Sequence, residues 1–150
     1  MDDIANLHGT CVALGGRGVL LRGPDGAGKS DLALRLIEGG ALLVADDRVV
    51  LARDGDSVIA RPPEALAGLL EVRGLGIVRL APAALVAAVP LHLVVDLVPG
   101  AEIERLPPPM RAELLGLSFA LARIDPFAAS APAKVRLAAD AGPGSIMPTP

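Results

Sequence analysis

The order of apolar and polar residues along the chain predicts a domain that mixes strands with short helices. Apolar runs of strand length recur between glycine- and proline-rich turns from residue 8 onward. The predicted strands are 8–14, 19–22, 42–45, 49–52, 58–60, 77–80 and 91–97, with two more within 112–124 around Gly116. The predicted helices are 31–38, 64–70, 82–89 and 128–141. Because strands and helices do not alternate strictly, we expect a single α/β domain built on a mixed sheet.

Glycine, proline and charge mark where the predicted elements end. Gly39-Gly40 predicts a glycine cap after the first helix, and Pro132 is expected to interrupt the last helix near its start. The segment 71–76 is charged and glycine-rich, which predicts a loop. With no sign of a second domain or a repeat, we expect a domain over 1–141 followed by a flexible tail, 142–150.

Composition narrows the function classes that fit this pattern. Of the 150 residues, 52% are hydrophobic but only 1% are aromatic, so we expect an aliphatic core and no aromatic stacking on single-stranded nucleic acid. A net charge of −3 provides no basic field for a nucleic-acid backbone or an anionic membrane. The acidic start carries no apolar signal core, and the longest uncharged stretch, 80–95, is too short to span a bilayer. We therefore expect a cytoplasmic protein whose single cysteine, Cys11, is buried as a small hydrophobe.

A phosphate-binding loop is the strongest chemical signal in the sequence. Residues 23–30 match the pattern G-x-x-x-x-G-K-[ST] and lie between a predicted strand and a predicted helix. The residues expected to hold a nucleotide are Gly23, Pro24, Asp25, Gly26, Ala27, Gly28, Lys29 and Ser30. In such a loop backbone N–H groups surround phosphate oxygens, the lysine reaches the β- and γ-phosphates, and the hydroxyl binds Mg²⁺. The alternative, a glycine-rich turn with an exposed lysine, is disfavoured by this strand and helix context.

Carboxylates at the ends of two predicted strands are candidates for metal binding and proton transfer. Phosphoryl transfer needs a carboxylate for Mg²⁺ and often a second one for the acceptor hydroxyl. Asp46 and Asp47 follow one strand, and Asp96 ends another. Because adjacent residues at a strand end point to opposite sides, one of Asp46 and Asp47 can face Mg²⁺ while the other faces an acceptor. The alternatives are that one of this pair caps a turn or pairs with Arg48, and that Asp96 is a cap.

Several segments together resemble the catalytic domain of HPr kinase/phosphorylase, the bacterial enzyme that acts on a serine of the phosphocarrier protein HPr. His8-Gly9 lies where that family has it, the loop 23–30 is followed by Asp31 in place of the usual glutamate, and 44–49 is similar to the family's acidic strand end. The most distinctive match is Glu71-Val72-Arg73-Gly74-Leu75-Gly76. The segments 104–106 and 113–117 resemble weaker landmarks, so that the resemblance extends from His8 to about Ala139.

The resemblance implies a role for each matching position in the nucleotide and metal sites. Lys29 and the loop backbone would hold ATP, while Ser30 and Glu71 would serve Mg²⁺. Asp47 would be the general base that takes the proton from the acceptor serine, which leaves Asp46 as the metal-facing member of the pair.

His8 and Arg105 would complete the catalytic group that the resemblance implies. The residues alone favour other interpretations: His8 as a structural histidine at a strand start, and Arg105 as a solvated charge beside Glu104, with Arg111 as a nearby competitor. Arg73 is an alternative anchor for its own loop.

Two departures from the family pattern affect the expected activity. Family members commonly carry an extra N-terminal domain, whereas this sequence begins just before the catalytic part. They also commonly have a loop Pro-Val-Arg-Pro-Gly-Arg-Asn before the last helix, linked to dephosphorylation. Here 124–130 reads Ile-Asp-Pro-Phe-Ala-Ala-Ser and lacks both arginines and the glycine. We therefore expect kinase activity to dominate over phosphorylase activity.

The sequence thus predicts an ATP- and Mg²⁺-dependent protein-serine kinase that acts on an HPr-like phosphocarrier. The family resemblance implies a homo-hexamer, and a mean hydropathy of +0.53 suggests apolar surface for subunit contacts. Two alternatives remain open. One is a small-molecule kinase, for which Arg53, Arg61 and Arg73 are candidate lid residues, and the other is a nucleotide-binding regulatory module without transfer activity.

Overall fold

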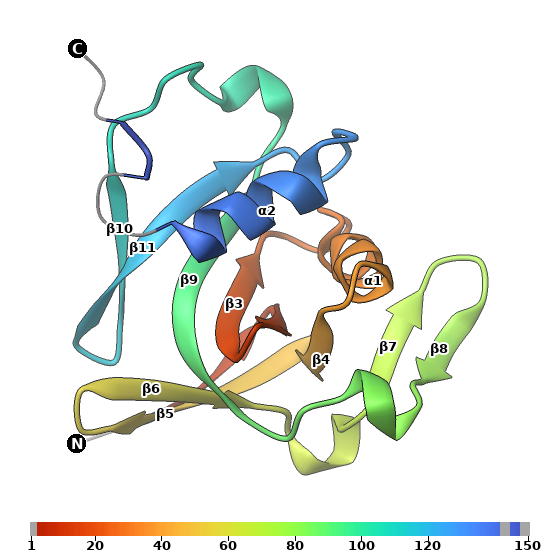
Figure 1. Ribbon diagram of the computed structural model, residues 1–150. Helices are drawn as coiled ribbons and strands as arrows, with labels where there is room; N and C mark the ends of the chain where they lie inside the picture. Colours follow the sequence, from red (N-terminus) through yellow and green to blue (C-terminus); the bar gives the residue numbers. More distant parts are fainter. Residues whose placement is uncertain (1–2, 142–144, 148–150) are drawn as a thin grey trace.

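A strongly curled mixed sheet forms the body of the molecule in the computed structural model, which describes residues 3–141 and 145–147 (Figure 1). The strands are β1 (Ile4–His8), β2 (Thr10–Leu14), β3 (Arg17–Arg22), β4 (Leu42–Ala45), β5 (Arg48–Asp54), β6 (Ser57–Arg61), β7 (Leu69–Val72), β8 (Gly76–Arg79), β9 (Val89–Leu97), β10 (Met110–Leu114) and β11 (Leu117–Ile124). The helices are α1 (Lys29–Glu38) and α2 (Ala131–Asp140), with short 3-10 turns η1 (Glu64–Leu66), η2 (Pro82–Ala84) and η3 (Gly100–Glu102).

The strand order places three parallel strands side by side. The main sheet runs β1-β5-β6-β9-β3-β2-β4, with the β10 and β11 hairpin joined through β11 to β9. Strand β9 pairs in parallel with both β3 and β11, and its Asp96 is in register with Arg22 on one side and Arg123 on the other. The carboxyl ends of these strands therefore lie at one edge of the sheet, which is where ligands bind in open α/β sheets. Strands β7 and β8 form a separate hairpin beside α1.

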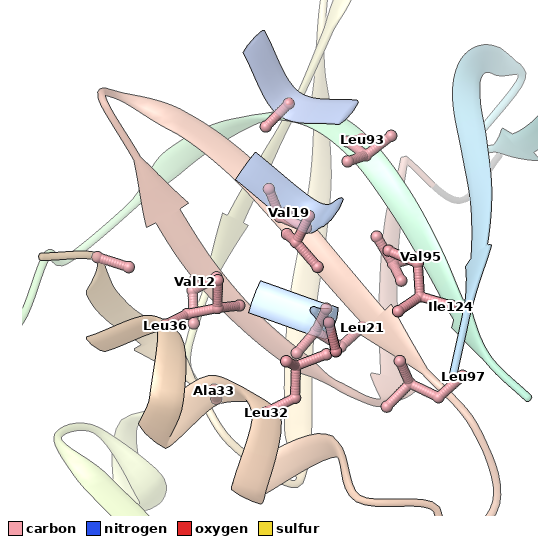
Figure 2. Packing of buried hydrophobic residues seen from close by; sticks show 14 of the residues in the cluster. Val12, Val19, Leu21, Leu32, Ala33, Leu36, Leu93, Val95, Leu97 and Ile124 are labelled. Carbon is pink, nitrogen blue, oxygen red and sulfur yellow. The ribbon is translucent and has the colours of Figure 1, made fainter. Parts of the chain in front are cut away.

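Alternating side chains on the central strands build two aliphatic clusters, one on each face of the sheet. Val19 and Leu21 of β3 pack with α1 and α2 residues such as Leu36 and Val135, an arrangement that Figure 2 shows around α1. Leu20, between them in sequence, points to the opposite face and joins a cluster with residues of β5, β6 and β10. This period of two is what a strand covered on both faces requires. The prediction of an aliphatic core is confirmed.

Most of the predicted strands are present, but the first one is divided. Residues 10–14 of the predicted strand 8–14 form β2, whereas His8 ends a separate strand, β1, and Gly9 lies between the two. A Cβ atom at Gly9 would lie 3.1 Å from the Leu20 side chain and 3.2 Å from the Leu21 carbonyl oxygen, so only glycine fits there without displacement. The Gly9 N–H donates to the Asp47 carbonyl oxygen at 3.1 Å. Strand β1 pairs with β5, a contact between distant segments that local patterning does not predict.

Two helix predictions in the remainder of the chain are wrong, and one loop prediction is correct only in part. The helix predicted over 64–70 is only η1, because Gly68 adopts a left-handed φ of 78° and the next residues form β7, where Leu70 is fully buried. Of the loop predicted over 71–76, only 73–75 form the turn, because Glu71 and Val72 belong to β7 and Gly76 begins β8. The helix predicted over 82–89 is only η2, and Val89 begins β9.

The last helix begins later than predicted, at Ala131, so that Pro132 lies in its first turn instead of interrupting it. Proline is tolerated there because the N–H group that it lacks has no partner within the helix. The predicted tail, 142–150, lies mostly outside the described residues, and the domain boundary stays a prediction. No helix in the described part of the chain is long and apolar enough to cross a membrane.

The buried thiol of Cys11 offers a direct test of this fold. Cys11 is fully buried on β2, and burial raises the pKa of its thiol to about 12. We expect a disulfide reagent at pH 8 to react with it far more slowly in the native protein than in denaturant. Between pH 9 and 12 an unfolded thiol ionises while the folded one does not, so unfolding should become easier as pH rises. Rapid stoichiometric labelling without denaturant would contradict this placement.

Candidate active site

The phosphate-binding loop (residues 23–30) connects the carboxyl end of β3 to α1. Gly26 and Gly28 have left-handed φ values of 80° and 99°, and Gly28 is the residue that immediately precedes the helix. Gly23 is also required, because a Cβ atom there would lie 2.9 Å from that of Ala27. The loop closes through a hydrogen bond from the Ala27 N–H to the Pro24 carbonyl oxygen at 3.0 Å. At the start of α1, N–H groups without partners in the helix provide the partial positive charge that favours an anion.

Lys29 is held by carbonyl oxygens of the same loop. Its ammonium donates to the Gly23 carbonyl oxygen at 2.7 Å and to that of Pro24 at 3.0 Å. These bonds satisfy the charge and keep the side chain folded over the loop. An incoming phosphate, as a charged acceptor, forms stronger hydrogen bonds than a carbonyl and can therefore compete for this ammonium.

Asp46 is the buried centre of the site. Its carboxylate is 5% exposed and accepts hydrogen bonds from the hydroxyls of Thr10 and Ser30, both at 2.8 Å. Its second oxygen accepts the backbone N–H of Glu71 at 2.9 Å. One side chain thus ties β2, the phosphate-binding loop and β7 to the end of β4. No buried side-chain polar atom in the described residues lacks a hydrogen-bond partner.

Asp47, next to the buried Asp46, has an exposed side chain. Its side chain is 61% exposed and has Oδ1 3.8 Å from Nδ1 of His8. Its backbone has a φ of 68°, a left-handed conformation that is uncommon for residues other than glycine and that recurs at functional sites. The turn is fixed by the hydrogen bond from Gly9 and by one from the Arg48 N–H to the Asp46 carbonyl oxygen at 2.8 Å. Asp47 is therefore presented to solvent by a rigid turn.

A cavity of about 680 Å³ joins these groups. The residues that line it are Thr10, Asp25, Gly26, Gly28, Lys29, Ser30, Asp31, Leu34, Asp46, Asp47, Glu71, Val72, Arg73 and Phe127. Of the predicted nucleotide-binding residues, Gly23, Pro24 and Ala27 do not line it. Sequence reasoning gave no role to Thr10, Val72 or Phe127, although a threonine entering an apolar strand was an available signal.

Three predicted candidates, His8, Asp96 and Arg105, are not among the residues that line the cavity. His8 is connected to it only through its 3.8 Å approach to Asp47. Arg105 is on an exposed segment after η3, and the structure does not place it among the lining residues described above. Asp96 forms a two-point ion pair with Arg22, with distances of 2.7 Å to Nε and 3.1 Å to Nη2. Asp96 therefore fixes the strand that leads into the phosphate-binding loop, and the Arg105 role stays a prediction.

The oxygen atoms at Asp46 fit a metal ion whose remaining ligands would come from a bound nucleotide and water. Among the described residues, no group of three histidine, cysteine, aspartate or glutamate side chains is arranged to hold a metal ion. Mg²⁺ typically takes one or two carboxylates and completes its octahedron with waters and phosphate oxygens. The Asp46 carboxylate beside the Ser30 hydroxyl matches that requirement, and Glu71 adds an exposed carboxylate on the same wall.

Comparison with known proteins relates this geometry to one family. The model of the HPr Serine kinase C-terminal domain matches residues 1–106. The HPr kinase/phosphorylase of Limosilactobacillus reuteri (strain DSM 20016) is 47% identical over 74 residues, covering 49% of this chain and 23% of that protein. That of Burkholderia lata is 46% identical over 110 residues, covering 69% of this chain and 34% of that protein.

The fold is similar to a solved structure. The Hpr(Ser) kinase/phosphatase from Coxiella burnetii matches with a TM-score of 0.78 and 25% sequence identity, over 87% of this chain and 91% of that chain. The α/β fold with a curled mixed sheet agrees with this match. The match to each of the two curated relatives nevertheless spans no more than about a third of that protein's length.

The hydrogen bonds of Asp46 predict that stability depends on this residue more than on its neighbour Asp47. Replacing Asp46 by alanine leaves the buried Thr10 hydroxyl without its partner, so we expect a loss of about 1–3 kcal/mol in the free energy of unfolding. The matched control is Asp47→Asn, which keeps an exposed polar residue that tolerates a positive φ and should change stability by less than about 0.5 kcal/mol. Urea denaturation followed by circular dichroism measures both. Equal losses would contradict the central position of Asp46.

Proposed function

This chain belongs to the family of the HPr serine kinase C-terminal domain, and on that basis we propose that it transfers the γ-phosphoryl group of ATP to a serine of an HPr-like phosphocarrier protein. The observation that carries the proposal is the common cavity onto which the phosphate-binding loop, the buried Asp46 and the exposed Asp47 all open. Phosphoryl transfer needs a phosphate donor, a metal ion and a base for the acceptor hydroxyl close to one another, and these three groups would supply them.

The loop and Lys29 are proposed to hold the triphosphate. Lys29 would exchange the carbonyl oxygens of Gly23 and Pro24 for phosphate oxygens, and the start of α1 would contribute its N–H groups. Ser30, Asp46 and Glu71 are proposed to hold Mg²⁺, which would neutralise negative charge on the phosphates. Support for this set is the 2.8 Å bond between the Ser30 hydroxyl and Asp46.

Asp47 is proposed as the general base, with His8 beside it. An exposed carboxylate on a rigid turn can reach the hydroxyl of a protein that docks from solvent, whereas the buried Asp46 cannot. His8 lies 3.8 Å from Asp47, so that a small movement of either exposed side chain would allow His8 to hydrogen-bond and orient it. Arg105 is proposed to stabilise negative charge on the phosphoryl group during transfer. It would reach the cavity only if its exposed segment moved, for example when the acceptor protein docks.

The carrier and the assembly are likewise proposals. The printed names of the relatives connect them with HPr, and an HPr-like protein is therefore the proposed acceptor. Leu75 and Ile77 expose apolar side chains on the hairpin of β7 and β8, next to the wall formed by Glu71 and Arg73. An exposed apolar surface beside the cavity favours a protein as the acceptor. A small-molecule kinase would instead enclose its substrate. The hexamer implied by the resemblance stays a prediction.

Separating nucleotide binding from proton transfer tests this assignment. Lys29→Ala should weaken ATP binding and abolish transfer, because it removes the cation from the loop. Asp47→Asn should leave ATP binding nearly unchanged and slow transfer by at least about 10²-fold, because the amide accepts no proton. Calorimetry with ATP and a phosphorylation assay measure the two effects. An Asp47→Asn protein that phosphorylates at near wild-type rate would overturn the base assignment.

The direction of the reaction gives a second test. Phosphorolysis requires inorganic phosphate to lie next to a phosphoserine, which needs positive charge to offset the repulsion. The segment 124–130 has no cation, and Arg123 and Lys134 only flank it. We expect phosphorylated carrier with millimolar phosphate and no ATP to release pyrophosphate far more slowly than the forward reaction proceeds. Comparable rates would show that the family's arginine-bearing loop is dispensable.

A further inference from the structure

An exposed aromatic ring lines the nucleotide cavity, although aromatic side chains are otherwise almost absent from this protein. The sequence has two phenylalanines and no tryptophan or tyrosine. Phe119 is 9% exposed and belongs to the core, whereas Phe127 is 71% exposed. Of the lining residues given above for the described part of the chain, Phe127 alone carries an aromatic ring. Core packing does not account for its position.

Phe127 is placed at the edge of the sheet where nucleotides bind. It lies on the loop that follows β11, and β11 and β3 are the two parallel neighbours of β9. The loops after β3 and β11 therefore leave the sheet at the same edge. They meet at Gly28, where a Cβ atom would lie 3.3 Å from Cε1 and Cζ of the Phe127 ring. The ring thus borders the loop that is proposed to hold the phosphates.

The backbone under Phe127 is held by a side chain of its own loop and by one from α1. The Phe127 N–H donates to Oδ1 of Asp125 at 3.0 Å. Oδ2 of the same carboxylate fits against Gly100, lying 2.9 Å from where a Cβ atom of that residue would be. The guanidinium of Arg35, on α1, donates to the Pro126 carbonyl oxygen. Because these contacts fix the backbone of the loop, a ligand that binds the ring has to order only its side chain, which lowers the entropic cost of binding.

We propose that the Phe127 ring is the stacking platform for the base of the bound nucleotide. A flat apolar face at the mouth of a phosphate site is what a base requires once its phosphates are anchored, and any base can stack on it because every base has a π-face. The inference rests on the proposed nucleotide binding and adds to it the nucleoside as a recognised part of the ligand. It predicts weak discrimination between purine bases, because an aromatic face carries no hydrogen-bond code.

Comparing nucleotides with inorganic tripolyphosphate isolates the contribution of the base. In the wild-type protein ATP and GTP should bind with similar affinity, and both should bind more tightly than tripolyphosphate. Phe127→Ala should weaken ATP binding by about 5- to 150-fold and leave tripolyphosphate binding unchanged. Phe127→Tyr should retain ATP affinity, whereas Phe127→Leu should lose it, because leucine keeps apolar bulk without an aromatic face. Calorimetry with Mg²⁺ present measures each dissociation constant.

Two further variants separate stacking from general effects. Asp125→Ala releases the loop under the ring and should weaken ATP binding in the same direction as Phe127→Ala, with tripolyphosphate again unaffected. Leu137→Ala removes an equally exposed apolar side chain from α2, outside the cavity wall, and should change neither affinity.

Three outcomes would overturn the platform without overturning the proposed function. Equal weakening of ATP and tripolyphosphate by Phe127→Ala would mean that the ring supports the loop instead of the base. Unchanged ATP affinity with a raised KM for the acceptor protein would assign Phe127 to docking. If the wild-type protein bound tripolyphosphate and ATP with equal affinity, the base would contribute nothing to binding. The base site would then be contradicted, whereas phosphate binding would still stand. Protein that binds neither ligand would instead overturn the proposed function, and the platform with it.

Discussion

A single buried carboxylate, that of Asp46, connects the parts of the candidate site. Removing a charge from water is unfavourable unless hydrogen bonds replace its hydration, and here Thr10, Ser30 and the Glu71 backbone supply them. Each donor comes from a different segment, so the carboxylate can be satisfied only when β2, α1 and β7 are all in place. Assembly of the site and completion of the fold are therefore coupled through the same bonds.

The topology of the sheet then determines what surrounds this carboxylate. Three parallel strands deliver three loops to one edge, and the first of these loops carries the phosphate-binding glycines. The Asp96 and Arg22 ion pair fixes the strand just before that loop, while the turn at Asp47 projects a second carboxylate outward. The adjacent residues Asp46 and Asp47 thus have different surroundings, one buried and one exposed, which is the basis for proposing different roles for them.

Local sequence was sufficient where a residue type is imposed by backbone geometry. The glycines of the phosphate-binding loop and the aliphatic strands of the sheet were predictable, because each follows from a pattern of a few residues. The resemblance to a family was also predictable from the order of these motifs, and the comparisons confirm it.

Long-range pairing accounts for what the sequence did not show. Residues 69–72 have an ambiguous apolar pattern, and their strand forms because Leu70 is buried against the core and Glu71 meets Asp46. Thr10 gains its partner from a residue 36 positions away. Phe127 acquires significance only because the loop after β11 returns to Gly28. No motif records such contacts, since they depend on how the sheet curls.

The most direct test of the central claim follows the γ-phosphate of ATP to its acceptor. The purified chain would be incubated with γ-labelled ATP and Mg²⁺, together with an HPr-type protein and a panel of small metabolites, and the label located by mass spectrometry. The account predicts that the label appears on one serine of the carrier protein and requires Mg²⁺. Label on a metabolite, or tight ATP binding without any labelled acceptor, would contradict it.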